Sequence, residues 1–154
     1  MSEVISRREL LVRGAAAALA ATAFPALLRG SAGTAMLVYK DPACGCCAKW
    51  VGLMKAAGFE MSVKDTTDMA PIKQRYHVGP ALASCHTALV SGYVVEGHVP
   101  ADLIRRMLQE KPKILGLSVP GMVTGSPGME GATRVPYQVL AFDATGKTTV
   151  YARR

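Results

Sequence analysis

The sequence predicts a single α/β domain, and three observations support this fold class. Short apolar runs with the alternation typical of strands are separated by stretches with the spacing of amphipathic helices. Gly and Pro residues mark most of the boundaries between these runs. The chain has 154 residues, and 50% of them are hydrophobic, which is enough for one domain with a modest core.

The N-terminal segment, residues 1–35, has the layout of an export signal and is set apart from this domain. A charged start precedes an apolar run, residues 14–28, which is shorter than the ~20 residues of a membrane span. Residues 6–11, SRRELL, resemble the twin-arginine signal, which carries folded proteins across the membrane. Val12 departs from that motif, which usually continues with Lys or Arg.

Small residues place the expected cleavage site after Ala32 or Ala35. We therefore expect a periplasmic protein with one domain, residues 36–154, and no stable membrane span after cleavage. An uncleaved N-terminal anchor is the alternative, and Pro25 counts against it. Removing residues 1–35 takes away four Arg and two Glu, so the formal charge falls from +7 to +5. The remaining basic residues are scattered, which argues against nucleic acid as a partner.

Residues 36–65 are predicted to form a strand, a helix and a second strand. The first strand is Met36–Lys40, and the second is Phe59–Asp65. Helical spacing begins at Cys47, and Gly58 ends the helix. The residues predicted to face the core are Trp50, Leu53, Met54 and Ala57 of the helix and Phe59, Met61 and Val63 of the second strand.

The chain is predicted to continue with a short helix, a hairpin and a third helix. The hairpin joins Thr87–Val90 to Tyr93–Glu96 through a tight Ser-Gly turn. The last helix starts near Pro100, and its inward-facing residues are Leu103, Ile104, Met107 and Leu108. Strand, helix, strand, helix, hairpin, helix is the thioredoxin-like order, whose first crossover gives a parallel pair of strands with a helix packed on the sheet.

Residues 112–154 are predicted to be an extension of this core. They contain a Gly/Pro-rich loop, KILGLSVPGMVTGSPGMEG, and then a hairpin, VPYQVLAF–DATG–KTTVYA. The complete prediction is a thioredoxin-like sheet with flanking helices plus a C-terminal loop and β-hairpin extension.

Three of the four cysteines, Cys44, Cys46 and Cys47, lie within four consecutive positions. In the predicted fold they lie where the first strand leads into the first helix, and the free N–H groups there favour thiolate over thiol. Lys49 adds a nearby positive charge. By analogy with thioredoxin-like folds, the loop that carries Cys85 lies against the same helix end. We therefore expect four sulfurs around one shallow cleft.

Two interpretations of the cysteines involve disulfide chemistry. Structural disulfides suit an exported chain with an even cysteine count, but a Cys44–Cys47 bridge closes a short loop and contributes only about 2 kcal/mol. Thiol–disulfide exchange suits the C-x-x-C spacing of the same pair. The additional thiols of Cys46 and Cys85 would trap mixed disulfides, which weakens this second interpretation.

Metal binding by four thiolates is the third interpretation and the one we favour. Structural zinc sites usually take cysteines in two separated pairs, and iron–sulfur ligation lacks its usual spacing here. Adjacent cysteines share their sulfurs between several ions more easily, and soft thiolates select Cu(I). The predicted cofactor is therefore copper, as more than one Cu(I) ion.

Other residues are candidates for a supporting role. His86 adjoins Cys85 and either ligates metal or orients the thiolate, whereas His98 is expected to cap a helix or to lie on the surface. Met122 and Met129 lie in the flexible loop, where they either contact copper or pack on an apolar surface. No local motif marks a catalytic nucleophile.

Three blocks of the sequence resemble a known family. They are CGCCAKWV, LASCHTALVSGYVVEGHVPADLI and GLSVPGMVTGSPGME, and the resemblance extends from about residue 38 to residue 130. The blocks are similar to those of the small periplasmic CopG-like proteins, which are associated with bacterial copper resistance and known largely as a domain of unknown function with a CxCC motif. The resemblance implies a thioredoxin-like fold, a periplasmic location and copper ligation by Cys44, Cys46, Cys47 and Cys85.

The functional prediction is an exported protein that holds Cu(I) through a four-cysteine site, for copper resistance by sequestration or transfer. A thioredoxin-like thiol or copper oxidoreductase is the alternative, so the question of enzymatic activity stays open, with metal binding favoured. Copper ions are the expected partner, and another periplasmic copper-handling protein is the candidate recipient.

Overall fold

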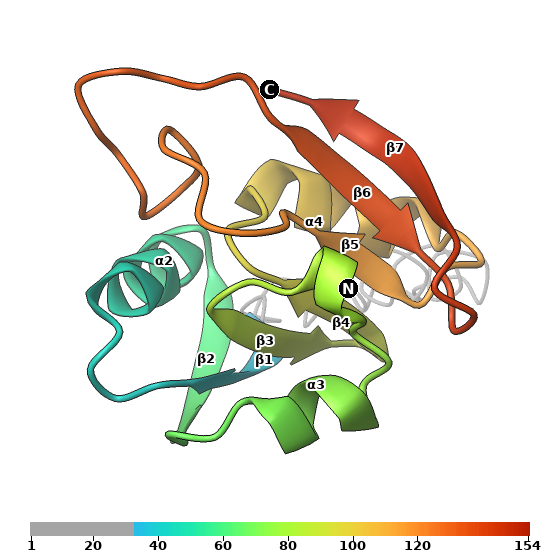
Figure 1. The fold of residues 1–154 in the computed structure, drawn as a ribbon, viewed down its shortest axis with the longest axis horizontal. Coiled ribbons are helices and arrows are strands. Elements are labelled where there is room, and N and C mark those ends of the chain that lie inside the picture. The colour runs from blue at the N-terminus through green and yellow to red at the C-terminus, as the bar shows by residue number, and fades with distance from the viewer. Residues whose placement is uncertain (1–32) are drawn as a thin grey trace, which may run out of the picture. The chain divides into compact units, whose positions relative to one another are not determined.

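The computed structural model describes residues 33–154 (Figure 1). In this part of the chain, a seven-stranded sheet has the order β2-β1-β3-β4-β5-β6-β7. Its strands are β1 (Thr34–Lys40), β2 (Phe59–Asp65), β3 (His86–Val90), β4 (Tyr93–Glu96), β5 (Gly116–Ser118), β6 (Gln138–Phe142) and β7 (Thr148–Arg153). The helices are α2 (Gly45–Ala56), α3 (Ala70–Arg75) and α4 (Ala101–Glu110), with a 3₁₀ turn, η1 (Pro80–Leu82).

The thioredoxin-like core has the predicted order of elements. β1 pairs with β2 in parallel and with β3 antiparallel, and β3 and β4 form the predicted hairpin. Ser91 and Gly92 both have positive φ, 47° and 85°, as a tight two-residue hairpin turn requires. The predicted α/β class and thioredoxin-like topology are confirmed.

The two faces of the sheet carry different helices. Trp50 and Met54 of α2 and Met107 of α4 pack with alternate residues of the central strands in the main core. The opposite face carries a smaller apolar cluster that includes Val78 and Leu82, next to α3 and η1. Because side chains alternate along a strand, β3 directs His86 toward α2 and the neighbouring Thr87 toward α3. This alternation separates the two groups of polar residues described below.

Two of the predicted core positions are exposed. Leu53 is 41% exposed and Val63 is 40% exposed, so the prediction that they face the core is wrong. The buried face of α2 is narrower than its apolar sequence pattern, and Leu53 lies outside it. β2 is an edge strand whose second half is exposed, which leaves Val63 uncovered although the strand alternates.

The C-terminal extension continues the same sheet. β5, which the sequence analysis did not predict, pairs in parallel with β4, and the predicted hairpin β6–β7 adds to it. β5 passes so close to β4 that a Cβ at Gly116 would lie 2.0 Å from the carbonyl oxygen of Val94. Arg106 of α4 stacks on the ring of Tyr151 at 3.9 Å and holds β7 against that helix.

The loop between β5 and β6 returns to the first helix, and Figure 1 shows it running beside α2. Gly128 has φ +84°, and a Cβ there would lie 2.9 Å from the backbone nitrogen of Trp50 and 3.0 Å from the carbonyl oxygen of Cys46. Only glycine permits this approach and this conformation. The extension thereby contributes to the surroundings of the cysteines.

The predicted export signal lies almost entirely outside the described residues. Its last three residues, 33–35, are the exception, and Thr34 and Ala35 belong to β1, where they pair with Phe59 and Glu60 of β2. Among residues 33–154, no helix has the length and apolar character needed to cross a membrane.

Candidate metal centre

The first helix begins inside the cysteine motif. Cys44 is the N-cap of α2, and its Sγ accepts a hydrogen bond from the N–H of Cys47 at 3.4 Å. Before it, the side chain of Asp41 accepts a hydrogen bond from the N–H of Ala43 at 2.7 Å and shapes the turn that leaves β1. Cys46 and Cys47 therefore lie in the first turn of the helix, whose free N–H groups create a positive potential.

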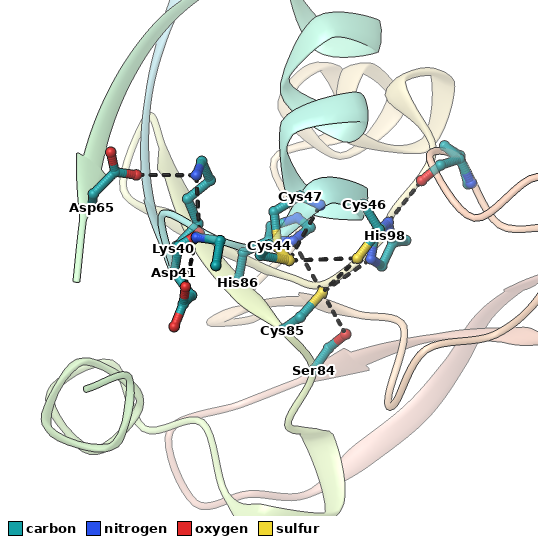
Figure 2. The surroundings of a disulfide bond; sticks show 12 residues. Lys40, Asp41, Cys44, Cys46, Cys47, Asp65, Ser84, Cys85, His86 and His98 are labelled. Atoms are coloured by element: carbon teal, nitrogen blue, oxygen red, sulfur yellow. Dashed lines mark hydrogen bonds and ion pairs between the residues drawn. A yellow bond between two sulfur atoms is a disulfide. The ribbon is translucent and has the colours of Figure 1, made fainter. Parts of the chain in front are cut away.

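The four sulfurs converge, as Figure 2 shows. Cys44 Sγ lies 3.5 Å from Cys46 Sγ, and Cys46 Sγ lies 3.9 Å from Cys85 Sγ. All four Sγ atoms lie within 4.8 Å of one another. Cys47 is buried, and the other three cysteines are half-buried. The expectation that the backbone brings Cys85 to the other three cysteines is confirmed.

Two of the four sulfurs are joined. Cys44 and Cys47 form a disulfide, whereas Cys46 and Cys85 are free thiols. The structure therefore has the C-x-x-C pair in its oxidised form, which differs from four thiols by two electrons and two protons. No disulfide links the two free thiols to each other or to Cys44 and Cys47. In this form Cys85 therefore does not form a structural disulfide with the cysteines of α2.

His98 is a site residue that the sequence analysis missed. Its side chain is fully buried, and its Nε2 lies 3.0 Å from Cys85 Sγ, so the expected capping or surface role is wrong. The sequence places His98 just before a helix, but the loop at Pro127 covers it and accepts a hydrogen bond from Nδ1–H at 2.8 Å. A histidine thirteen residues after a candidate metal-binding cysteine was the available signal, and only the fold shows that it points inward.

The thiol of Cys85 keeps its proton at neutral pH. Burial raises the pKa of Cys85 to about 11, and repulsion from Cys46 contributes. The Nδ1–H of His98 is used on the Pro127 carbonyl, so Nε2 presents a lone pair that accepts the S–H of Cys85. Metal binding at Cys85 must therefore release a proton.

His86 lies deeper than His98. Its ring packs on Trp50 with centroids 4.5 Å apart, and its Nδ1 lies 3.5 Å from Cys85 Sγ. Its buried Nε2 has no hydrogen-bond partner. Burial lowers the pKa of His86 to about 3, with the charge of His98 as the next cause. His86 is therefore neutral at physiological pH and offers a nitrogen lone pair.

Acid should destabilise the fold through His86. As the pH falls below 6.5, the unfolded chain binds a proton at this histidine and the folded chain does not, so stability is lost between pH 6.5 and about 3. We expect the free energy of unfolding of the metal-free protein to fall by about 2 kcal/mol between pH 6.5 and 5 from this residue. Urea unfolding at both pH values measures the loss. His86→Phe should reduce the loss, and an equal loss in that variant would contradict the assignment.

A buried ion pair supports the Cys85 loop from the other face of the sheet. Glu96 is fully buried at the end of β4, where its carboxylate pairs with Lys73 of α3. The same carboxylate accepts hydrogen bonds from the N–H of Ser84 at 2.6 Å and from the hydroxyl of Thr87 at 2.7 Å. Glu96 thus holds the backbone immediately before Cys85. Sequence reasoning placed Glu96 only in a strand and did not identify this role.

The two loop methionines have different surroundings. Met122 is 62% exposed, so the alternative that it packs on an apolar surface is wrong. Met129 is half-buried, and its N–H donates to the Ser126 carbonyl within the loop. Their contact with copper stays a prediction.

The chain is similar to known proteins in its sequence and in its fold. A family model described as a protein of unknown function, DUF411, matches residues 82–129, which include Cys85, both site histidines and both loop methionines. Two solved structures, described as copper resistance protein CopG in form 2 and form 1, are each 40% identical. Each match covers 79% of this chain and 98% of that chain, with TM-scores of 0.75 and 0.74. The search among curated proteins found no match.

Proposed function

The chain belongs to the CopG family of copper resistance proteins, and from this premise we propose that it binds copper as Cu(I) through Cys44, Cys46, Cys47 and Cys85. The observation that supports this proposal most strongly is the convergence of all four Sγ atoms within 4.8 Å. Soft thiolate ligands favour Cu(I) over harder ions. The function is copper resistance, through sequestration of the ion or its transfer.

The spacing of the sulfurs suits bridging. Two sulfurs that bind one ion through metal–sulfur bonds of about 2.3 Å can be up to about 4.6 Å apart. The separations of Cys46 from Cys44 and from Cys85, 3.5 Å and 3.9 Å, both fall in this range. The sulfur of Cys46 thus has two neighbouring sulfurs, each close enough for one ion to bind both members of the pair. We therefore propose that Cys46 bridges more than one copper ion.

Copper loading requires the reduced form of the site. The Cys44–Cys47 disulfide removes two thiolates from the ligand set. Anaerobic protein treated with a phosphine reductant, which is then removed, should bind clearly more Cu(I) per chain than untreated protein, as measured by elemental analysis with a free-thiol count. Equal copper content in both samples would contradict a four-thiolate site. One zinc ion per chain in protein from copper-supplied cells would indicate a structural zinc site instead.

The proposal includes export to the periplasm. A twin-arginine-like signal in residues 6–11 would carry the domain across the membrane already folded. Cleavage after Ala32 leaves β1 whole, whereas cleavage after Ala35 removes two residues of it, so we favour Ala32. Three half-buried sulfurs leave a path for copper to enter and to pass to another copper-handling protein.

A thiol or copper oxidoreductase is the second candidate function, and one observation favours it. The Cys44–Cys47 disulfide lies at a helix N-terminus, the position at which C-x-x-C pairs exchange disulfides. Cys46 separates the two functions, because dithiol exchange does not need its sulfur. If the protein turns over a disulfide substrate and Cys46→Ser keeps the full rate, the result would support this second candidate.

A further inference from the structure

The C-terminal extension forms a cavity with α2 and the start of α4, apart from the four cysteines. Its volume is about 420 Å³, and none of its lining residues is a cysteine or a histidine. Ligand sites are usually concave and mostly apolar, with a few polar groups that fix the orientation of the ligand. We propose that this cavity binds a carboxylate carried on a small apolar body, with Arg134 as the principal group that holds the carboxylate. The inference goes beyond the proposed function, and its test needs no copper.

Apolar side chains form much of the wall of the cavity. They are Leu53 of α2, Pro100 before α4, Pro127 of the loop and the ring of Tyr137. Leu53 is 41% exposed, so this apolar surface is open to solvent. A single exposed leucine is ordinary, but together with three other apolar groups it offers a surface on which a ring or a short aliphatic chain can pack.

Arg134 brings a positive charge to this cavity. Among residues 33–154, the ion pairs do not include Arg134. The loop fixes where its side chain begins, because the N–H of Val135 donates to the Thr124 carbonyl at 3.1 Å. A Cβ at Gly125 would lie 2.6 Å from Cγ of Arg134, so the stem of this side chain lies directly on that glycine. An unpaired guanidinium can bind a carboxylate through two parallel N–H···O bonds.

Two more polar groups lie on the same side of the cavity. Tyr137 and Arg154 are joined through their backbones, since the N–H of each donates to the carbonyl of the other, at 3.0 Å and 2.9 Å. Burial raises the pKa of Tyr137, and the charges of Arg154 and Arg134 act in the opposite direction, so both guanidinium groups lie near the phenol. Arg154 is already paired with Asp102. Arg134 therefore supplies the unpaired charge, and the Tyr137 hydroxyl is a further donor.

Glu130 limits the charge of the ligand. Its carboxylate accepts a hydrogen bond from the N–H of Gly128 at 2.7 Å, which lowers its pKa, and the charges of Lys49 and His98 are further causes. The groups that act on Glu130 thus differ from the two arginines that act on Tyr137, so opposite charges occupy different sides of the cavity. A second carboxylate on the ligand would be repelled by Glu130. The ligand class is therefore a monocarboxylate.

The cavity lies directly beside the metal centre. Pro127 lines it, and the carbonyl of the same residue accepts the Nδ1–H of His98 at 2.8 Å. A ligand in the cavity would thus contact the loop that covers His98. A free monocarboxylic acid and the C-terminal carboxylate of a peptide with an apolar last residue share the required chemistry, and the test distinguishes these two sources.

Benzoate is the first probe. It is titrated into the ¹⁵N-labelled full chain while the amide shifts are recorded by NMR, and we expect saturable shifts at Arg134, Tyr137 and Arg154. Benzamide has the same ring without the charge and should bind at least about tenfold more weakly, because the charge-assisted hydrogen bonds are lost. Terephthalate adds a second carboxylate across the ring and should also bind more weakly than benzoate. Glu130→Gln should narrow that difference.

Variants at two exposed positions test the assignment of residues. Arg134→Gln should weaken benzoate binding at least about tenfold. Leu53→Asp places a negative charge in the wall and should abolish binding. The matched control is Arg75→Gln, at an exposed arginine of α3 outside the cavity, which should leave the affinity unchanged. Circular dichroism checks that each variant is folded, and since Arg134 and Leu53 are both exposed, we expect that they are.

Each outcome decides the proposal. Absence of saturable shifts at the lining residues would overturn it, and so would equal affinity for an acid and its amide, or full affinity in Arg134→Gln or Leu53→Asp. Tighter binding of N-acetyl-phenylalanine than of benzoate, with loss of binding in its C-terminal amide, supports the site with a chain terminus as the source. Tighter or equal binding of benzoate supports the site with a free acid as the source. None of these results depends on the four-cysteine site, so failure here leaves the proposed function intact.

Discussion

Replacement of Cys46 by Ser is expected to lower the copper content of the reduced protein by at least half. Cys46 Sγ lies 3.5 Å from Cys44 Sγ and 3.9 Å from Cys85 Sγ, so it is the sulfur that connects the helix cysteines to the loop cysteine. A hydroxyl is a poor ligand for Cu(I) and does not bridge ions as a thiolate does. Elemental analysis of anaerobically loaded protein measures the change.

The matched control is Ala48→Ser, which places a hydroxyl on an exposed position of the same helical turn. It should leave the copper content unchanged. Cys46→Ser should also leave the Cys44/Cys47 pair able to form its disulfide, because the pair closes without Cys46 in the structure. Unchanged copper content in Cys46→Ser would exclude a bridging role and would favour the oxidoreductase interpretation.

Replacement of Glu96 by Ala is expected to destabilise the protein by about 3–5 kcal/mol, the usual effect of removing one partner of a buried ion pair. The carboxylate is fully buried, and its loss would leave the ammonium of Lys73 and the N–H of Ser84 without their acceptor. Ser84 precedes Cys85, so the loss of this hydrogen bond should also loosen the backbone that positions the Cys85 thiol. We therefore expect the folded fraction of the variant to bind copper more weakly. Urea unfolding and a competitive Cu(I) titration measure the two effects.

Two further variants test the cause of this loss. Glu110→Ala removes an exposed carboxylate that pairs with Arg106 on α4, and it should cost less than about 1 kcal/mol. Glu96→Met combined with Lys73→Met removes both buried charges and should recover much of the stability, since neither partner is then left unpaired. A loss in Glu96→Ala no larger than that in Glu110→Ala would show that the buried pair does not support the Cys85 loop.

Local patterns in the sequence predicted most of the core elements. The alternation from Phe59 to Asp65 agrees with the bounds of β2, and the Ser91-Gly92 turn identified the hairpin. These signals are strong because strand alternation and positive φ depend on residues that are adjacent in the chain. β5 was missed because three residues, Gly116–Ser118, are too few to show a period.

Exposure was less predictable than secondary structure. Leu53 and Val63 follow the apolar spacing of their elements, yet both are exposed. A periodic pattern identifies the apolar side of an element, but whether another element covers each position depends on the packing of the whole sheet.

The sequence by itself determined the soft-ligand chemistry of this protein, because three cysteines in four positions at the start of a helix are local in the chain. With the thioredoxin-like order, it also indicated where Cys85 returns. Only the tertiary structure decided that His98 faces Cys85 and that Glu96 holds the loop before it. Both depend on contacts between distant segments, with Pro127 on one side and Lys73 on the other. Such contacts leave no periodic signal in the sequence, since they are made by the packing of the C-terminal extension and α3 around the core.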